Sequence, residues 1–119
     1  MGWLDALHRP RAEDPRAALV APIEQALRAL GWVVGEVWPP RVVTSAFGSD
    51  DGMPFEQWLA QVFLPRLYEA RAAGQWPPRS DVAAAAYRNL DGQPGVESLL
   101  RLLAQLDELI NKGIHAARG

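Results

Sequence analysis

Hydrophobic side chains return every three or four positions in three stretches of this chain, which is the spacing of a helix with one buried face. These stretches predict helices over about 15–30, about 54–73 and about 94–110, and the pattern leaves open an extension of the last to about 117. A weaker, alanine-rich stretch predicts a short helix over about 81–89, which would need support from its neighbours. The pattern therefore predicts an all-α fold, a four-helix-like bundle with a short third helix.

Residues typical of helix ends flank these stretches. Asp14-Pro15 begins the first helix, because Asp accepts hydrogen bonds from free amides and Pro at the first position loses none. Gly74 follows the second helix, where a left-handed terminal residue is common. Ser80 or Asp81 is predicted to cap the short third helix.

The second predicted helix has the most hydrophobic face and is expected to form the axis of the core. Pro65 lies inside it and cannot donate a hydrogen bond to the carbonyl of Gln61, so a kink or a division of the helix is predicted there. Arg66 has two interpretations: the kink aims it inward, or its side chain lies along the helix toward solvent. Pro22 is expected to bend the first helix or to split its first turns.

The connection between the first two helices covers about 32–53 and has no helical period. Connections of this length are uncommon in compact domains and often have a function. Two interpretations remain open. Either the connection covers the core with its apolar residues, or it presents aromatic residues to a partner. The apolar residues concerned are Trp32, Val34, Val37 and Trp38. Residues 1–13 are expected to form either a short docking helix or a frayed, loosely attached N-terminal tail, and the helix is favoured because a tryptophan at position 3 is costly to leave in water.

Composition limits the possible chemistry. The 119 residues suit one domain over 1–119, and the hydrophobic share of 49% with 22% charged residues is typical of a globular protein. The chain has no cysteine, which excludes disulfides, thiolate metal sites and cysteine nucleophiles. Its two histidines leave little material for a histidine metal site or a Ser-His-Asp triad. We therefore predict no metal site and no cofactor.

The charge pattern does not favour nucleic acid or membrane as a partner. The net charge is −2, and neither half offers the basic footprint of a nucleic-acid binder. No apolar run approaches the roughly 18 residues of a membrane span, and the N-terminus lacks the pattern of a secretory signal. We therefore expect a cytoplasmic protein.

Three places contain candidate functional residues. Asp50-Asp51 precedes the second helix, where carboxylates favour the helix N-terminus, although paired carboxylates could also bind a hard cation. Arg66 lies beside the predicted kink. Asp107 interrupts the apolar stripe of the last helix, and we expect it to pair with an arginine, for which Arg66 is one candidate. The tyrosines and tryptophans are expected to pack in the core rather than to stack on a base.

The stretch around the second helix resembles the YqcC-like family of small bacterial proteins of unknown function. The resemblance rests on Asp51-Gly52-Met53 and on the run Trp58-Leu59-x-x-Val62-Phe63-Leu64-Pro65-Arg66-Leu67, preceded by an aromatic near Phe47. It extends over about 45–112 through Pro77-Pro78, Tyr87 and Asp107. This chain has Gly52, Ala60 and Leu67 where that family often has Thr, Gln and Met.

The resemblance implies an all-helical bundle without known catalytic activity. It also implies an association with tRNA modification, because members are sometimes encoded beside a tRNA pseudouridine synthase. Our leading hypothesis is a non-catalytic interaction module that binds a protein partner or a second copy of itself. The alternatives are a small-ligand binder or enzyme at the kink, and an accessory protein of tRNA modification. The candidate interaction or ligand residues are Trp38, Phe47, Asp51, Met53, Trp58, Arg66 and Asp107.

Overall fold

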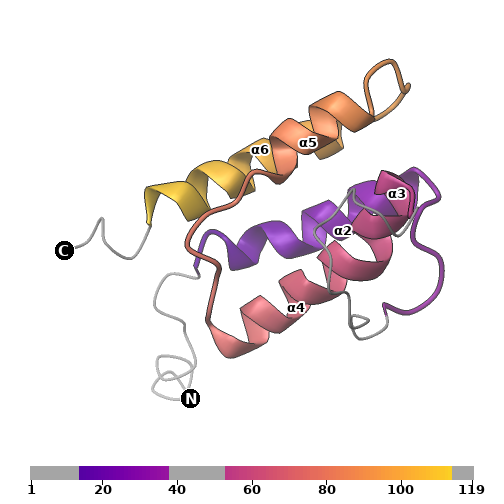
Figure 1. The fold of residues 1–119 in the computed structure, drawn as a ribbon. Helices are drawn as coiled ribbons and strands as arrows, with labels where there is room; N and C mark the ends of the chain where they lie inside the picture. Colours follow the sequence, from indigo (N-terminus) through magenta and orange to yellow (C-terminus); the bar gives the residue numbers. More distant parts are fainter. Residues whose placement is uncertain (1–13, 38–52, 114–119) are drawn as a thin grey trace, which may run out of the picture.

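In the computed structural model, which describes residues 14–37 and 53–113, every regular element of those residues is helical (Figure 1). The elements in order are η1 (Ala17–Leu19), α2 (Val20–Ala29), α3 (Phe55–Trp58), η2 (Leu59–Phe63), α4 (Leu64–Ala73), α5 (Val82–Asn89) and α6 (Glu97–Lys112). Because α3, η2 and α4 follow one another without a gap, they form the single long helix that the sequence predicts. The predicted all-α fold with four helices and a short third helix is confirmed.

The second helix ends where its sequence predicts, at Gly74, which has left-handed backbone angles. The last helix, α6, ends at Lys112, between the predicted ends at about 110 and about 117, and Gly113, which the prediction did not use, caps it with left-handed angles. At the other end, Pro22 is the third residue of α2, and the 3-10 turn η1 precedes that helix. A proline there loses no hydrogen bond, since the first amides of a helix have no partner within it. The expected split of the first turns is therefore found.

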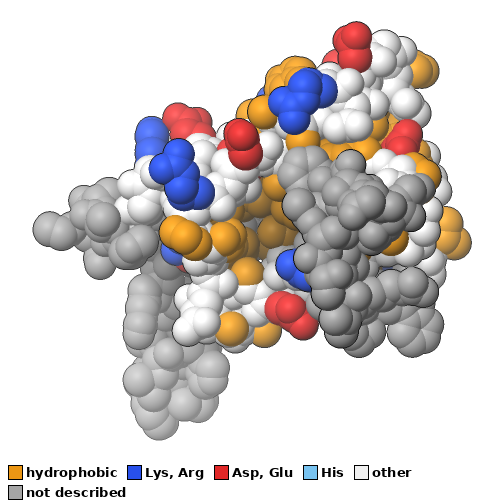
Figure 2. All heavy atoms as spheres, in the orientation of Figure 1, with side chains coloured by type: hydrophobic (Ala, Val, Ile, Leu, Met, Phe, Trp, Pro, Cys, Tyr) orange, Lys and Arg blue, Asp and Glu red, His pale blue; other side chains and the backbone are white. Residues whose placement is uncertain are grey.

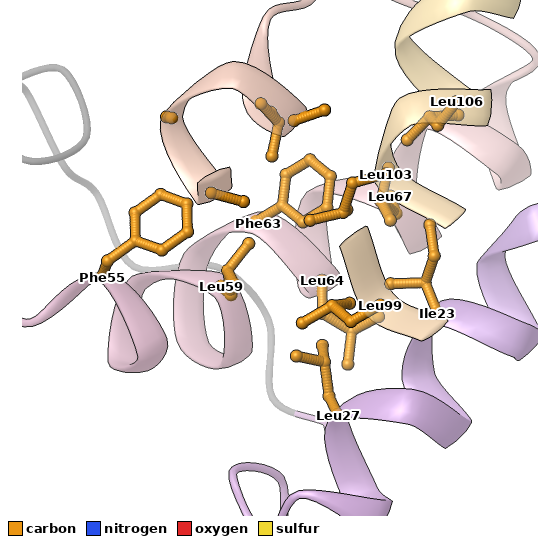
Figure 3. Packing of buried hydrophobic residues seen from close by; sticks show 14 of the residues in the cluster. Ile23, Leu27, Phe55, Leu59, Phe63, Leu64, Leu67, Leu99, Leu103 and Leu106 are labelled. Atoms are coloured by element: carbon orange, nitrogen blue, oxygen red, sulfur yellow. The ribbon is translucent and has the colours of Figure 1, made fainter. Parts of the chain in front are cut away.

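Helix α2 lies at the centre of the packing and contacts both α4 and α6, while α5 packs on α6 (Figure 1). Apolar side chains from all these helices meet in one core (Figure 3). Ile23 and Leu27 from α2 point toward Leu64 from α4 and Leu99 from α6 in this view. The largest fully buried side chains are Ile23, Leu27, Leu59, Leu64, Leu90, Leu99, Leu103, Leu106, Val20 and Val62. The core predicted from helical spacing is thus observed.

The proline of the second helix is accompanied by a π-helical segment, η2, which ends two residues before it. The amide of Leu64 donates to the carbonyl of Leu59, five residues back, and Pro65 then enters α4 without an amide hydrogen to donate. A π turn holds one more residue than the α turn that it replaces. The predicted irregularity at Pro65 therefore takes the form of a one-residue expansion of the helix.

This expansion changes which residues face the core. In an uninterrupted α-helix, the face that contains Phe55, Leu59 and Val62 would next contain Arg66, because the spacing is three or four residues. In the structure Leu67 is buried at that level and Arg66 is exposed. The expectation that the irregularity aims Arg66 inward is therefore wrong, and the expectation of an outward side chain is confirmed.

Candidate functional site

Of the predicted site residues, the four that the structure describes, Met53, Trp58, Arg66 and Asp107, do not gather into one place. Trp38, Phe47 and Asp51 lie outside the described residues, as do residues 1–13. Met53 and Trp58 are half-buried, and Trp58 stacks between Phe55 and Phe63 with ring centroids 5.9 and 5.5 Å away. The ring of Trp58 is thus part of the packing around α3 and η2.

Asp107 and Arg66 do not form the expected pair. Asp107 is 8% exposed on α6, and its carboxylate accepts hydrogen bonds from the hydroxyl of Ser80 and, at 2.7 Å, from the backbone amide of Ala83. Arg66 is exposed on α4, and no ion pair joins it to Asp107 in the part of the chain that the structure describes. A buried carboxylate is satisfied here by neutral donors, which is a common alternative to an ion pair.

These contacts make Asp107 the cap of a different helix. Asp81 is the N-cap residue of α5 but provides no side-chain hydrogen bond, so the expected local cap from Ser80 or Asp81 is wrong. The carboxylate of Asp107 instead takes the free amide of Ala83 at the start of α5. One turn further along α6, the side chain of Asn111 accepts from the amide of Ser80 at 2.8 Å and donates to its carbonyl at 2.9 Å. We call Asp107, Asn111 and Ser80 the α5 clasp.

A second polar group links α2, α4 and the connection that follows α2. The hydroxyl of Tyr68 on α4 donates to one carboxylate oxygen of Glu24, and Nε of Arg28 donates to the other at 2.6 Å. Nη2 of Arg28 donates to the backbone carbonyl of Gly35 at 2.7 Å. The guanidinium of Arg71 lies 4.7 Å from the centre of the Tyr68 ring, within the range of a cation–π contact. We call Glu24, Arg28 and Tyr68 the connection anchor.

The pKa values in the connection anchor follow from its hydrogen bonds. Burial works to raise the pKa of Glu24, but the hydrogen bonds from Tyr68 and Arg28 outweigh burial, and the pKa is lowered. The pKa of Tyr68 is raised, chiefly because its hydroxyl donates to the Glu24 carboxylate and also because the ring is partly buried. At neutral pH Glu24 is therefore charged and Tyr68 keeps its proton.

A further polar contact joins Asp14 and Arg16, at the beginning of the described part of the chain. The guanidinium of Arg16 donates to both carboxylate oxygens of Asp14 at 3.0 and 2.8 Å and lies 5.4 Å from the ring centre of Trp76. The hydrogen bond from Arg16 lowers the pKa of Asp14 against the opposing effect of burial. Asp14 also accepts from the backbone amide of Arg16, as the predicted helix start requires. The Asp14–Arg16 pair therefore has a structural role, because both carboxylate oxygens of Asp14 accept hydrogen bonds from Arg16.

The connection after α2 shows an exposed aliphatic side chain next to a buried one. Val33 is 8% exposed and belongs to the core, whereas Val34 is 84% exposed. Trp32 and Val37 are partly buried and pack against the core. The expectation that Val34 covers the core is therefore wrong. The residue that does so is Val33, its neighbour.

The described residues contain no group of three or more His, Cys, Asp or Glu side chains that could hold a metal ion. Across 14–37 and 53–113, no helix combines the length and hydropathy needed to cross a bilayer. Among the described residues on the face shown in Figure 2, Lys and Arg side chains are interspersed with neutral and acidic ones. These residues show no continuous basic stripe of the kind typical of nucleic-acid binders.

Comparison with known proteins gives one match. The model of a domain family of unknown function, DUF446, described as "tRNA pseudouridine synthase C", matches residues 16–109 of the 119. The chain belongs to the DUF446 family. No curated protein and no solved structure matches the chain. The DUF446 match covers all the helices described above except the last residues of α6.

Sequence reasoning missed the residues that organise the connection in this DUF446 member. Glu24 and Arg28 are four residues apart, a spacing that predicts a surface pair on the first helix. Nothing in the sequence links them to Tyr68, which is 44 positions away from Glu24. One of the two interpretations of the connection places Val34 against the core rather than Val33, because an irregular segment gives no period from which its buried side can be read.

Proposed function

We propose that this protein is a non-catalytic interaction module, and that the connection after α2 is its contact surface for a protein partner. The observation that carries the proposal is the exposure of Val34, at 84%, within a segment that the fold holds in place on both sides of it. Val33 anchors the segment in the core, and Gly35 is bonded through its carbonyl to Arg28. An aliphatic side chain presented by a fixed segment suits a small apolar contact in a protein interface.

The sequence places further apolar residues in the same connection. Trp38 and Phe47 follow Val34 along the chain, and the proposal includes both as contact residues together with Asp51 and Met53. Aromatic residues are enriched in interfaces and contribute much of their binding energy. A homodimer through this surface is one form of the proposal, and a different protein is the other.

The enzyme or ligand site at the helix irregularity has less support. Its two charged residues have different environments. Arg66 on α4 is exposed to solvent, whereas the carboxylate of Asp107 on α6 accepts hydrogen bonds from Ser80 and Ala83. A binding site that used both would have to break the α5 clasp, which holds the start of α5. The interaction module requires no such rearrangement.

The description of the family model favours a second candidate function, an accessory role in tRNA modification. In this form of the proposal, the partner of the module is a tRNA-modifying enzyme, and the enzyme rather than this chain binds the RNA. The net charge of −2 agrees with this arrangement, because a protein that binds RNA itself usually carries an excess of positive charge. The motif from Asp51 to Leu67 further supports the view that the chain is a YqcC-like member of its family.

The test is affinity capture of the tagged full chain from its own source, followed by identification of the captured proteins and by sedimentation of the purified chain. Val34→Ser and Trp38→Ala should each abolish capture or dimer formation. Tyr87→Ser is the matched control, because Tyr87 is 55% exposed and belongs to α5, which is not part of the connection. Capture that survives Val34→Ser and Trp38→Ala would overturn the proposed surface. An accessory role predicts a tRNA-modifying enzyme among the captured proteins and no binding of tRNA by the purified chain.

A further inference from the structure

The connection anchor has a feature that an ordinary surface pair lacks. A pair of Glu and Arg four residues apart on one helix needs no third group and contributes little to stability. Here each side chain of the Glu24–Arg28 pair also makes a hydrogen bond to a residue outside α2. The free carboxylate oxygen of Glu24 is taken by Tyr68 on α4, and a second N–H of Arg28 is taken by Gly35 in the connection.

The chemistry of each member suits this relay. The guanidinium of Arg28 has several donors in a fixed plane, so it can bind a carboxylate with Nε and a carbonyl with Nη2 at once. The phenol of Tyr68 can approach Glu24 only while its ring stays in place, and the nearby guanidinium of Arg71 favours that position. Both charged side chains of the Glu24–Arg28 pair are partly shielded, with exposures of 14% and 32%.

The receiving end of the relay is a turn at Gly35. Its φ of +77° is a conformation that other residues rarely adopt, and apart from Gly35 and its two chain neighbours no residue has a heavy atom within 4 Å of the position where a Cβ would stand. The glycine is therefore required by the backbone conformation and not by lack of space. In this conformation its carbonyl meets Arg28, one residue after the exposed Val34.

We propose that Tyr68, Glu24 and Arg28 are positioning residues that fix residues 32–37, so that α4 controls how Val34 is presented to the partner. The part of this inference that concerns a partner rests on the proposed function. The part that concerns the conformation of residues 32–37 does not depend on it. Loss of the Tyr68 hydroxyl frees Glu24 to move with Arg28, and the carbonyl of Gly35 then loses its fixed donor. The connection remains attached to the core through Val33, but its backbone from Val34 to Val37 no longer has a single fixed conformation.

The test uses nuclear magnetic resonance of the labelled full chain, together with the capture assay. Tyr68→Phe removes one hydroxyl and keeps the ring beside Arg71, while Arg28→Lys keeps the charge but cannot bond both acceptors in the same planar arrangement. Tyr87→Phe is the matched control for loss of a tyrosine hydroxyl. The resonances observed are Nε–H of Arg28, the carbonyl carbon of Gly35 and the methyl groups of Val33 and Val34.

We expect Tyr68→Phe and Arg28→Lys to shift or broaden the Gly35 and Val34 signals and to weaken capture by roughly five-fold, the effect of one net hydrogen bond. Tyr87→Phe should change neither. Unchanged Gly35 signals in both variants would overturn the relay, and changed signals with undiminished capture would overturn control of the partner surface. If the wild-type chain captures no partner, the proposed function fails, while the Gly35 signals still decide whether the relay exists. Urea unfolding of each variant confirms that it is folded.

Discussion

The α5 clasp and the connection anchor both join segments that are far apart in sequence, but they do so with different chemistry. In the clasp, a buried carboxylate accepts only from neutral groups, and the contacts join α6 to the first turn of α5 and to Ser80, which lies just before that helix. In the anchor, a carboxylate of lowered pKa binds an arginine and a tyrosine, and the last contact is with an irregular segment. The comparison suggests that the clasp holds the fold together, whereas the anchor sets the shape of a surface.

The largest effect is expected from removal of the clasp carboxylate. Asp107→Ala leaves a buried amide at Ala83 and the hydroxyl of Ser80 without partners, so we expect the free energy of unfolding to fall by about 2–4 kcal/mol. Urea unfolding measures this loss. Asp107→Asn is the matched control, because it keeps an acceptor oxygen and should lose less. An Asp107→Ala variant as stable as the wild type would show that Asp107 does not hold α5.

A smaller effect is expected from the anchor. Tyr68→Phe removes one hydrogen bond at a partly exposed site, so the loss in unfolding free energy should be about 0.5–1.5 kcal/mol. Urea unfolding next to Tyr87→Phe gives the comparison. A loss as large as that of Asp107→Ala would remove the distinction between a fold-holding and a surface-setting group.

The connection anchor and the Asp14–Arg16 pair should also make the stability of the protein depend on pH. The lowered pKa values of Glu24 and Asp14 mean that their contributions are present above their usual values of 4.5 and 3.8 and are lost as the pH falls through the lowered values. The raised pKa of Tyr68 adds a contribution present below pH 10.0 and lost as the pH rises through the raised value. Urea midpoints between pH 2 and pH 6 should fall with acid. Glu24→Gln should reduce that slope, and an unchanged slope would contradict the assignment.

The smallest effect on stability is expected at the exposed end of the anchor. Val34→Ser changes a side chain that is 84% exposed, so the unfolding free energy should change by less than about 0.5 kcal/mol. Val33→Ser, its buried neighbour, should cost well over 1 kcal/mol in the same measurement. Equal losses would mean that the two valines do not differ in burial in solution.

The helices could be predicted because their evidence is local. Leu99, Leu103 and Leu106 repeat at helical spacing, and Gly74 ends the second helix in the way glycine commonly does. The second helix is also predictable from its local pattern, although Pro65 indicates only that an irregularity occurs in it. A proline shows that one hydrogen bond is missing, but it does not show whether the chain bends, breaks or takes in an additional residue.

The α5 clasp and the connection anchor could not be predicted, because their contacts join residues that are far apart in the sequence. The partners of Asp107 are 24 and 27 positions away, and a carboxylate that caps a distant helix has the same sequence appearance as one that pairs with an arginine. In the connection, a shift of one residue exchanges the inner and outer side chains, which is why the interpretation that the connection covers the core names Val34 instead of Val33. Nothing in the amino-acid order of such a segment decides between the two.

The π-helical segment η2 has a consequence for how relatives of this chain can be compared. It places the hydrophobic pattern after Phe63 one position out of phase with the pattern before it. A relative that lacks one residue between Leu59 and Phe63 could close the segment into a regular α turn and keep the same inward leucines. Such a relative would look like a deletion in an alignment while conserving the three-dimensional core. Removing Ala60 from this chain would reproduce that relative, and circular dichroism would then report an intact helix.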